Sequence, residues 1–261
     1  MNLIDKQVEK IKKEKRMGLM THVVVGYPSI DATEKLVKLM EKSGVDFIEL
    51  QIPFSDPLAD GPTIMKASEK ALENGTKVKD AFDLARKLSK HIKIPLLFMA
   101  YFNTLFKYGV EKFCKDAKEC GVAGLIVPDM PLEEESEEHF IKYANKYGLY
   151  HIRVISPAST DERLKKNSKV ASGFVYATAR QGITGARNSL DPNLISFLKR
   201  VRENFKVPVA VGFGISKKEH IDALKGYADI AILGSILIDV INNGGQTAMK
   251  DVEYFLRGIS K

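Results

Sequence analysis

Apolar residues follow two alternating patterns along the chain. Short apolar runs, typical of buried strands, are separated by longer segments in which apolar residues recur at every third or fourth position. The predicted strands cover residues 19–25, 46–52, 95–101, 122–127, 149–155, 173–178, 207–212 and 229–233. The predicted helices between them include residues 31–43, 62–74, 78–90, 111–120, 133–147, 191–204 and 217–225. Strands that alternate with helices favour a parallel sheet.

Eight strand–helix units favour an α/β fold in which residues 1–261 form a single (β/α)8 barrel, the TIM barrel. Gly44, Gly121 and Gly148 each stand between a predicted helix and the next strand, where a left-handed residue commonly ends a helix. A doubly wound open sheet is the alternative, but no GxGxxG motif follows the first strand to support it.

The first twenty residues carry six Lys or Arg and three Asp or Glu, so they supply +3 of the net charge of +7. Ile4, Val8 and Ile11 recur there at helical spacing, with lysines around most of the remaining surface. This pattern predicts an extra N-terminal helix that plugs one end of the barrel and exposes a basic face.

No basic stretch is interleaved with aromatic residues, so we expect no nucleic-acid partner. A small phosphorylated substrate is a sufficient partner for the mild positive charge.

Length and composition exclude several other classes of protein. A chain of 261 residues with 44% hydrophobic content is able to bury one sizeable core. No apolar run approaches the roughly 20 residues of a membrane span, and the charged N-terminus lacks a signal-peptide core, so we expect a cytoplasmic protein. Cys114 and Cys120 are too few for a disulfide framework, and the scattered histidines predict no metal site.

Residues 47–62 are the most informative segment for chemistry. They begin as an alternating strand and break at Pro53 into a loop rich in Pro, Ser and Asp. Glu49 lies on the strand among apolar residues, where an ionised carboxylate is costly, whereas Asp60 lies on the loop in wetter surroundings. Two such carboxylates are able to divide proton transfer between an acid/base and a permanently charged partner. The structural alternative is a Glu49 satisfied by a backbone amide and an Asp60 that merely forms a turn.

Two glycine-containing loops predict a phosphate site. Gly212-Phe213-Gly214 follows the seventh strand, and Gly234-Ser235 follows the eighth and begins a short apolar helix. Glycines let backbone amides approach an anion closely, and a helix N-terminus adds partial positive charge. The loops after strands seven and eight are the habitual phosphate site of these barrels. A tight turn and an ordinary helix cap are the alternatives.

The barrel hypothesis places functional groups at the C-terminal ends of the strands and in the loops that follow them. Residues with such groups fall there: Glu49, Asp60, Tyr101, Asn103, Asp129, Tyr176, Arg180, Thr184, Gly212, Gly214 and Ser235. The polar, glycine-hinged segment 179–189 follows the sixth strand, and its place at this rim predicts a lid over the site.

Seven short motifs in order along the chain resemble those of the tryptophan synthase alpha subunit family. They are Gly26-Tyr27-Pro28, residues 47–62, Tyr101-Phe102-Asn103, Pro128-Asp129-Met130-Pro131, Gly182-Ile183-Thr184-Gly185, Gly212-Phe213-Gly214-Ile215-Ser216 and Gly234-Ser235. The family cleaves indole-3-glycerol phosphate into indole and glyceraldehyde 3-phosphate. The resemblance therefore implies a carbon–carbon lyase of tryptophan biosynthesis.

The resemblance also implies roles for single residues. It makes Asp60 the carboxylate that stabilises positive charge on the indole nitrogen and Glu49 the group that relays protons. The implied substrate-binding residues are His22, Tyr101, Ile126, Val154, Tyr176 and Thr184, and the implied phosphate-binding residues are Gly185, Gly212, Phe213, Gly214, Gly234 and Ser235. Tyr176 is expected to hydrogen-bond to Glu49 and orient it, and Thr184 to touch Asp60.

The resemblance implies no metal or organic cofactor in this chain. It implies instead a tryptophan synthase beta subunit as partner, which carries pyridoxal phosphate, receives the indole and joins the chain in an allosteric α2β2-type heterotetramer. The loops 53–60 and 182–189 are expected to face that partner.

Two positions depart from the family pattern. Gln51 stands where glycine is usual, and its spacing from Glu49 points it into the barrel, where it either donates to Glu49 or recognises a different polar substrate. His22 stands at a usually aromatic position of the indole slot. Two alternatives follow: a paralogous barrel lyase or isomerase for another phosphorylated substrate, or a weakly catalytic allosteric partner subunit.

Overall fold

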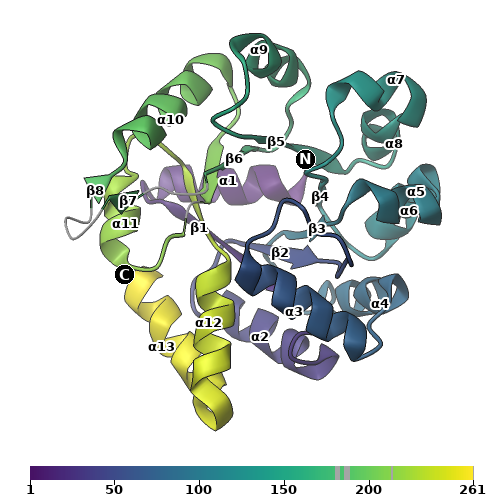
Figure 1. Ribbon diagram of the computed structural model, residues 1–261, viewed down its shortest axis with the longest axis vertical. Coiled ribbons are helices and arrows are strands. Elements are labelled where there is room, and N and C mark those ends of the chain that lie inside the picture. Colours follow the sequence, from purple (N-terminus) through teal and green to yellow (C-terminus); the bar gives the residue numbers. More distant parts are fainter. Residues whose placement is uncertain (180–182, 185–188, 213, 261) are drawn as a thin grey trace.

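The computed structural model describes residues 1–179, 183–184, 189–212 and 214–260 (Figure 1). Its parallel strands close into one barrel in the order β1-β10-β9-β6-β5-β4-β3-β2. The strands of the barrel are β1 (Gly18–Val24), β2 (Phe47–Gln51), β3 (Leu96–Met99), β4 (Gly124–Ile126), β5 (Tyr150–Ile155), β6 (Val175–Thr178), β9 (Val209–Gly212) and β10 (Ile230–Leu233). The predicted (β/α)8 barrel is therefore confirmed, and the open sheet is excluded.

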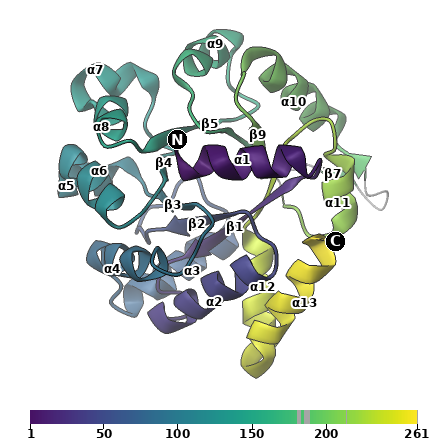
Figure 2. The same cartoon turned by 180° about the vertical axis from the view of Figure 1, so that it is seen from behind.

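Two further short strands, β7 (Ile183–Thr184) and β8 (Ser189–Leu190), pair antiparallel outside the barrel. Helices surround the barrel as a ring in both views (Figures 1 and 2). The described helices are α1 (Leu3–Lys13), α2 (Ile30–Lys42), α3 (Pro62–Glu73), α4 (Val78–Leu88), α5 (Phe102–Tyr108), α6 (Val110–Glu119), η1 (Leu132–Glu134), α7 (Glu135–Glu138), α8 (Phe140–Lys146), α9 (Asp161–Val170), α10 (Pro192–Asn204), α11 (Lys218–Ala223), α12 (Ser235–Gly244), η3 (Gly245–Thr247) and α13 (Ala248–Ser260). Over the described ranges, no helix is both long and apolar enough to cross a membrane.

The predicted helix over residues 133–147 is broken into η1, α7 and α8. His139 adopts the left-handed conformation at φ 56°, which interrupts the helix. The carboxylate of Glu135 then accepts the backbone N–H groups of Ile141 and Lys142 at 2.8 and 3.0 Å. A side chain therefore satisfies the new helix start, as N-terminal capping residues usually do.

The N-terminal helix α1 plugs one end of the barrel, as predicted, and Figure 2 shows it lying across that end. Its buried Ile4 and Ile11 join the apolar cluster inside the barrel. Glycines make room for them: a Cβ at Gly18 would lie 2.7 Å from Ile11 Cδ1, and one at Gly124 would lie 3.1 Å from Ile4 Cδ1. The sequence therefore keeps the strand starts small where the plug packs.

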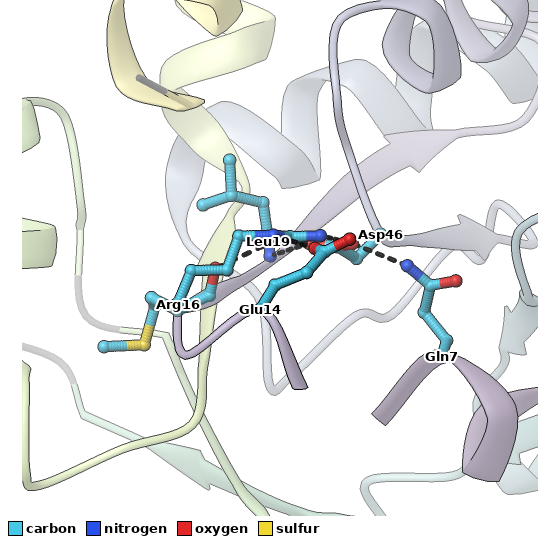
Figure 3. A network of polar contacts seen from close by, with 6 residues as sticks. Gln7, Glu14, Arg16, Leu19 and Asp46 are labelled. Carbon is cyan, nitrogen blue, oxygen red and sulfur yellow. Dashed lines mark hydrogen bonds and ion pairs between the residues drawn. The ribbon is translucent and has the colours of Figure 1, made fainter. Parts of the chain in front are cut away.

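A buried carboxylate joins α1 to the barrel (Figure 3). Asp46, which precedes β2, accepts Gln7 Nε2 at 2.6 Å, Arg16 Nη1 and Nη2 at 2.6 and 2.7 Å, and the backbone N–H of Leu19 at 2.9 Å. Both carboxylate oxygens are thus fully used by charged and neutral donors. The network connects the plug, the turn after it and the first two strands.

We predict that Asp46→Asn lowers the free energy of unfolding by about 2–3 kcal/mol, because it leaves buried donors without a charged acceptor. Glu14→Gln is the matched control, since Glu14 pairs with Arg16 at the exposed edge of the same network. It should change stability by less than about 0.5 kcal/mol. Urea unfolding of both variants measures the difference, and equal effects would contradict the role given to Asp46.

Candidate active site

The register between β1 and β2 brings two buried ionisable side chains together. His22 lies directly opposite Glu49, and its Nδ1 is 3.2 Å from Glu49 Oε1. The two residues are only 4% and 2% exposed. No backbone amide satisfies Glu49, and its Oε2 has no hydrogen-bond partner among the described residues. An unsatisfied buried carboxylate oxygen is rare in a purely structural role.

The charge of Glu49 acts on His22. Burial by itself lowers the pKa of His22, but the adjacent Glu49 carboxylate and the more distant Asp60 outweigh it, so the net pKa is raised above its ordinary value. The imidazole of His22 therefore keeps its proton to a higher pH than a histidine without a neighbouring carboxylate. The contact places His22 and Glu49 where they could exchange a proton.

Gln51 contacts the loop carboxylate rather than Glu49. Its Nε2 donates to Asp60 Oδ2 at 2.6 Å, and its buried Oε1 has no hydrogen-bond partner in the described part of the chain. The predicted orientation into the barrel holds, but the hypothesis that Gln51 donates to Glu49 is wrong, because the loop returns Asp60 to within reach of the amide. Gln51 therefore holds one of the two carboxylates in place.

Asp60 is half-buried and more exposed than Glu49, as expected. Burial nevertheless raises the pKa of Asp60 above its usual value, and His22, Gln51 and Tyr101 partly offset that rise. The expectation of an Asp60 that is simply solvated and permanently charged is therefore incomplete. Its charge depends on the polar groups around it.

Three buried polar atoms in this cluster have no described partner: His22 Nε2, Glu49 Oε2 and Gln51 Oε1. The two oxygens accept hydrogen bonds, and the ring nitrogen donates or accepts according to its protonation, so a substrate hydroxyl or an ordered water is able to satisfy them. The mouth of the barrel is therefore prepared for a polar ligand.

An aromatic pair forms one wall beside this cluster. The rings of Phe54 and Tyr101 stack at 5.2 Å with an interplanar angle of 21°. The Tyr101 hydroxyl accepts the backbone N–H of Ala59 at 3.0 Å and so ties the β2 loop to the barrel. Ile126 and Val154 belong to the same apolar cluster. Phe54 was not predicted as a site residue, although an aromatic residue in the loop after the strand that carries Glu49 was an available signal.

Tyr176 lies in register with Val154 on β5 and Ala210 on β9, on the side of the sheet that faces the barrel interior. Burial raises its pKa well above the ordinary value, and the charges of Glu49 and Asp60 add to the effect. The expected hydrogen bond to Glu49 is not formed among the described residues. The Tyr176 hydroxyl instead approaches Gly212, where a Cβ would lie 3.5 Å from it.

The two glycine loops leave neighbouring strands. Gly212 ends β9, Gly234 follows β10, and Ser235 is the first residue of the ten-residue α12. Gly214 has φ 81°, a conformation that other residues rarely adopt. The backbone N–H of Ser216 donates to Nδ1 of the buried His220 at 3.2 Å, which fixes the first loop and was not predicted.

Part of the predicted site falls outside the described residues. Arg180, Gly185 and Phe213 lie there, together with most of the predicted lid. Thr184 lies on β7. Their predicted roles stay predictions.

The closed barrel and its mouth define a TIM-barrel enzyme, with acid–base groups and glycine loops at the C-terminal ends of its strands. A family model described as "Tryptophan synthase alpha chain" matches residues 8–259. The tryptophan synthase alpha chain of Desulfotalea psychrophila is 46% identical over 246 residues, which cover 94% of this chain and 96% of that protein. That of Thermoanaerobacter sp. is 40% identical over 263 residues, which cover 100% and 99%.

Solved structures agree with the sequence relatives. Tryptophan synthase subunit alpha from Legionella pneumophila superposes with a TM-score of 0.90 at 32% identity, covering 100% of this chain and 97% of that one. A structure of Mycobacterium tuberculosis tryptophan synthase gives 0.89 at 30% identity, covering 98% and 96%. The chain belongs to the tryptophan synthase alpha chain family.

We predict that the ring of His22 titrates above its ordinary value of about 6.5, and that Glu49→Gln lowers this pKa by removing the adjacent negative charge. A raised folded-state pKa stabilises the protein fully below about pH 6.5, and this contribution is lost as the pH rises through the folded value. NMR titration of the histidine ring signals measures the shift. A His22 that titrates at or below its ordinary value in both proteins would contradict the pairing.

Proposed function

We propose that this chain cleaves indole-3-glycerol phosphate to indole and glyceraldehyde 3-phosphate, as the alpha subunit of a tryptophan synthase. Membership of the family supports the reaction, and the buried Glu49 with its unpartnered Oε2 at the barrel mouth is the observation that carries the assignment. The reaction is a retro-aldol cleavage, which needs a proton delivered to one atom and a proton removed from another.

The first step is protonation of indole C3, which places positive charge on the ring nitrogen. The glycerol hydroxyl next to the scissile bond then loses its proton, and its oxygen forms the carbonyl of the aldehyde. As the C–C bond breaks, its electron pair returns to the indole ring and neutralises the nitrogen. No electrons are gained or lost overall, so the chemistry needs only positioned acids and bases.

Glu49 suits the proton-relay role because one oxygen contacts His22 while the other is free. A proton that Glu49 takes from the hydroxyl stays on this buried carboxyl group beside His22 rather than passing to solvent. His22, at a position that is usually aromatic in the family, therefore becomes a positioning residue for Glu49 in this chain.

Asp60 suits stabilisation of the indole nitrogen provided that it is ionised. Gln51 holds Oδ2, which leaves Oδ1 for the ring N–H, and its hydrogen bond favours the charged form. The glutamine thus supports Asp60 and leaves Glu49 free. Tyr101, Ile126 and Val154 would form the apolar slot for the ring, and Tyr176 would bind the substrate beside them.

The phosphate would lie between the two glycine loops and the start of α12. Gly212, Gly214, Gly234 and Ser235 offer backbone N–H groups or a hydroxyl at adjacent strand ends. Gly185 and Phe213 would complete this site, and Thr184 would touch Asp60 as the lid closes over the substrate.

A partner subunit is part of the proposal. Leu58, in the β2 loop, and Phe106, on α5, are 86% and 60% exposed, and both follow C-terminal strand ends. Exposed apolar side chains at one rim suit a protein interface. The partner would be the beta subunit in an α2β2-type heterotetramer of the cytoplasm, with pyridoxal phosphate in the beta subunit and no cofactor in this chain.

Indole release from indole-3-glycerol phosphate, by the chain alone and with a beta subunit, tests the function directly. We expect release that rises with the partner. We predict that Glu49→Gln lowers kcat by at least about 10²-fold, because the proton relay is removed, while calorimetry still detects substrate binding. Glu73→Gln on the exposed face of α3 is the control and should keep wild-type activity. Substantial turnover by Glu49→Gln would sink the assignment.

The second candidate function is a paralogous lyase or isomerase for another phosphorylated substrate, with Gln51 as the specificity switch. Our proposal predicts that Gln51→Gly moves the acid limb of the kcat/KM profile to higher pH, because Asp60 loses a donor to its charged form. Gln51→Met keeps the volume and removes both polar atoms, so it should reproduce this shift. A rise in indole release by Gln51→Gly would instead favour the paralogue.

A further inference from the structure

A cavity lies beside the barrel mouth, on the outer side of β5. It has a volume of about 260 Å³ and lies between the loop after β4 and the start of α9. Arg153 and Val154 are consecutive on β5, so their side chains point to opposite faces of the sheet. Among the residues that the resemblance assigns to substrate or phosphate binding and that the structure describes, Val154 alone also lines this cavity. The cavity is therefore distinct from the slot inside the barrel.

The floor of this cavity is a buried arginine. Arg153 is 5% exposed, and its Nε donates to Asn167 Oδ1 at 2.8 Å while Nη2 donates to the carbonyl oxygen of Met130 at 3.1 Å. Asn167 is fixed in turn, since its Nδ2 donates to the carbonyl of Arg163 at 2.8 Å. The guanidinium is therefore held rigidly by neutral acceptors, and Nη1 has no hydrogen bond to a described residue.

This positive charge has no counter-ion in contact. No carboxylate of the described residues lies within 4.0 Å of Arg153. Burial lowers the pKa of its guanidinium, and Glu135 and Glu133 oppose that effect only through space. Buried charges in proteins are normally paired, because an unpaired one is strongly disfavoured. A second cation, Arg163, lines the same cavity.

The remaining wall limits the kind of anion. Val127, Met130 and Ile155 offer apolar surface, which suits an organic body attached to the anionic group. Asp129 also lines the cavity, and its Oδ1 accepts the backbone N–H of Phe102 at 2.8 Å rather than pairing with the arginine. A nearby carboxylate disfavours a doubly charged ligand more than a singly charged one.

We propose that this cavity binds a small organic acid. Its carboxylate pairs with Nη1 of Arg153 and with Arg163, and its apolar part packs on Val127, Met130 and Ile155. The arginine fork supplies directional donors, and the ligand supplies the missing counter-charge. The site adjoins the substrate slot through the two faces of β5 without being part of it.

Benzoate is a suitable probe, with inorganic phosphate as the comparison, on the full chain labelled with ¹³C-methyl methionine. Met130 lines the cavity and Met99 lies inside the barrel, so their methyl signals report the two sites separately. Met130→Leu and Met99→Leu identify the signals. We expect benzoate to move the Met130 signal saturably and to leave the Met99 signal in place.

Arg153→Gln should weaken benzoate binding by about tenfold or more, because the buried partner of the carboxylate is lost. Arg86→Gln removes an exposed arginine on α4 and should leave binding unchanged.

If Arg153→Gln does not fold, Arg163→Gln provides the test, because Arg163 is exposed; we expect several-fold weaker binding of benzoate. Equal binding by wild type and the folded Arg153 and Arg163 variants would overturn the site. If phosphate but not benzoate moved the Met130 signal, the proposal of an organic acid would be wrong. If benzoate moved only the Met99 signal, it would bind in the substrate slot and the proposed site would be wrong.

Discussion

Parallel strand pairing around a closed barrel is the constraint on which the site depends. Because the strands run in one direction, their C-terminal ends meet at one rim, and alternate side chains of each strand face inward. The β1–β2 register then sets His22 beside Glu49, and the β9–β10 pair sets Gly212 close to Gly234. A shift of β2 by one residue would turn Glu49 out of the barrel.

The two ends of the barrel divide stability and chemistry between them. At the end closed by α1, apolar side chains fill the interior, and the four donors around Asp46 satisfy its carboxylate. At the other end, His22, Glu49 and Gln51 each retain a buried polar atom that no described residue satisfies. Such atoms lower stability, and the well-packed closed end offsets that loss. Arg153 resembles these groups, because neutral acceptors fix its guanidinium but no carboxylate among the described residues neutralises its charge.

Much of the fold could be predicted because its signals are local. Each predicted strand overlaps an observed one, and the spacing of Ile4, Val8 and Ile11 identified the plug. The break at His139 was not predictable, because it depends on a left-handed residue and a capping side chain within an otherwise helical pattern. Helix α9 was missed too, since its largely exposed surface carries few apolar positions.

The sequence was a better guide to which residues lie at the candidate site than to the contacts that they make there. Glu49, Asp60 and the glycine loops follow from their places at strand ends, which the barrel hypothesis alone selects. The partner of Gln51 did not follow, because it depends on the path by which the next nine residues return to the mouth. Asn167 and Met130, the neutral partners of Arg153, come from other segments of the chain, and no local pattern in the sequence predicts these contacts.

The seat of α1 has a consequence for the order in which the chain folds. Asn2 donates to the carbonyl oxygens of Ala123 and Gly148, and a Cβ at Gly173 would lie 3.2 Å from Ile4. Helix α1 is synthesised before these segments, so it has no complete binding surface until Gly173 has been made. Until then its isoleucines remain uncovered, and contacts of such sequence separation form slowly. Helix α1 is thus made before the strands that hold it, and it docks late, onto a barrel that those later strands have already formed.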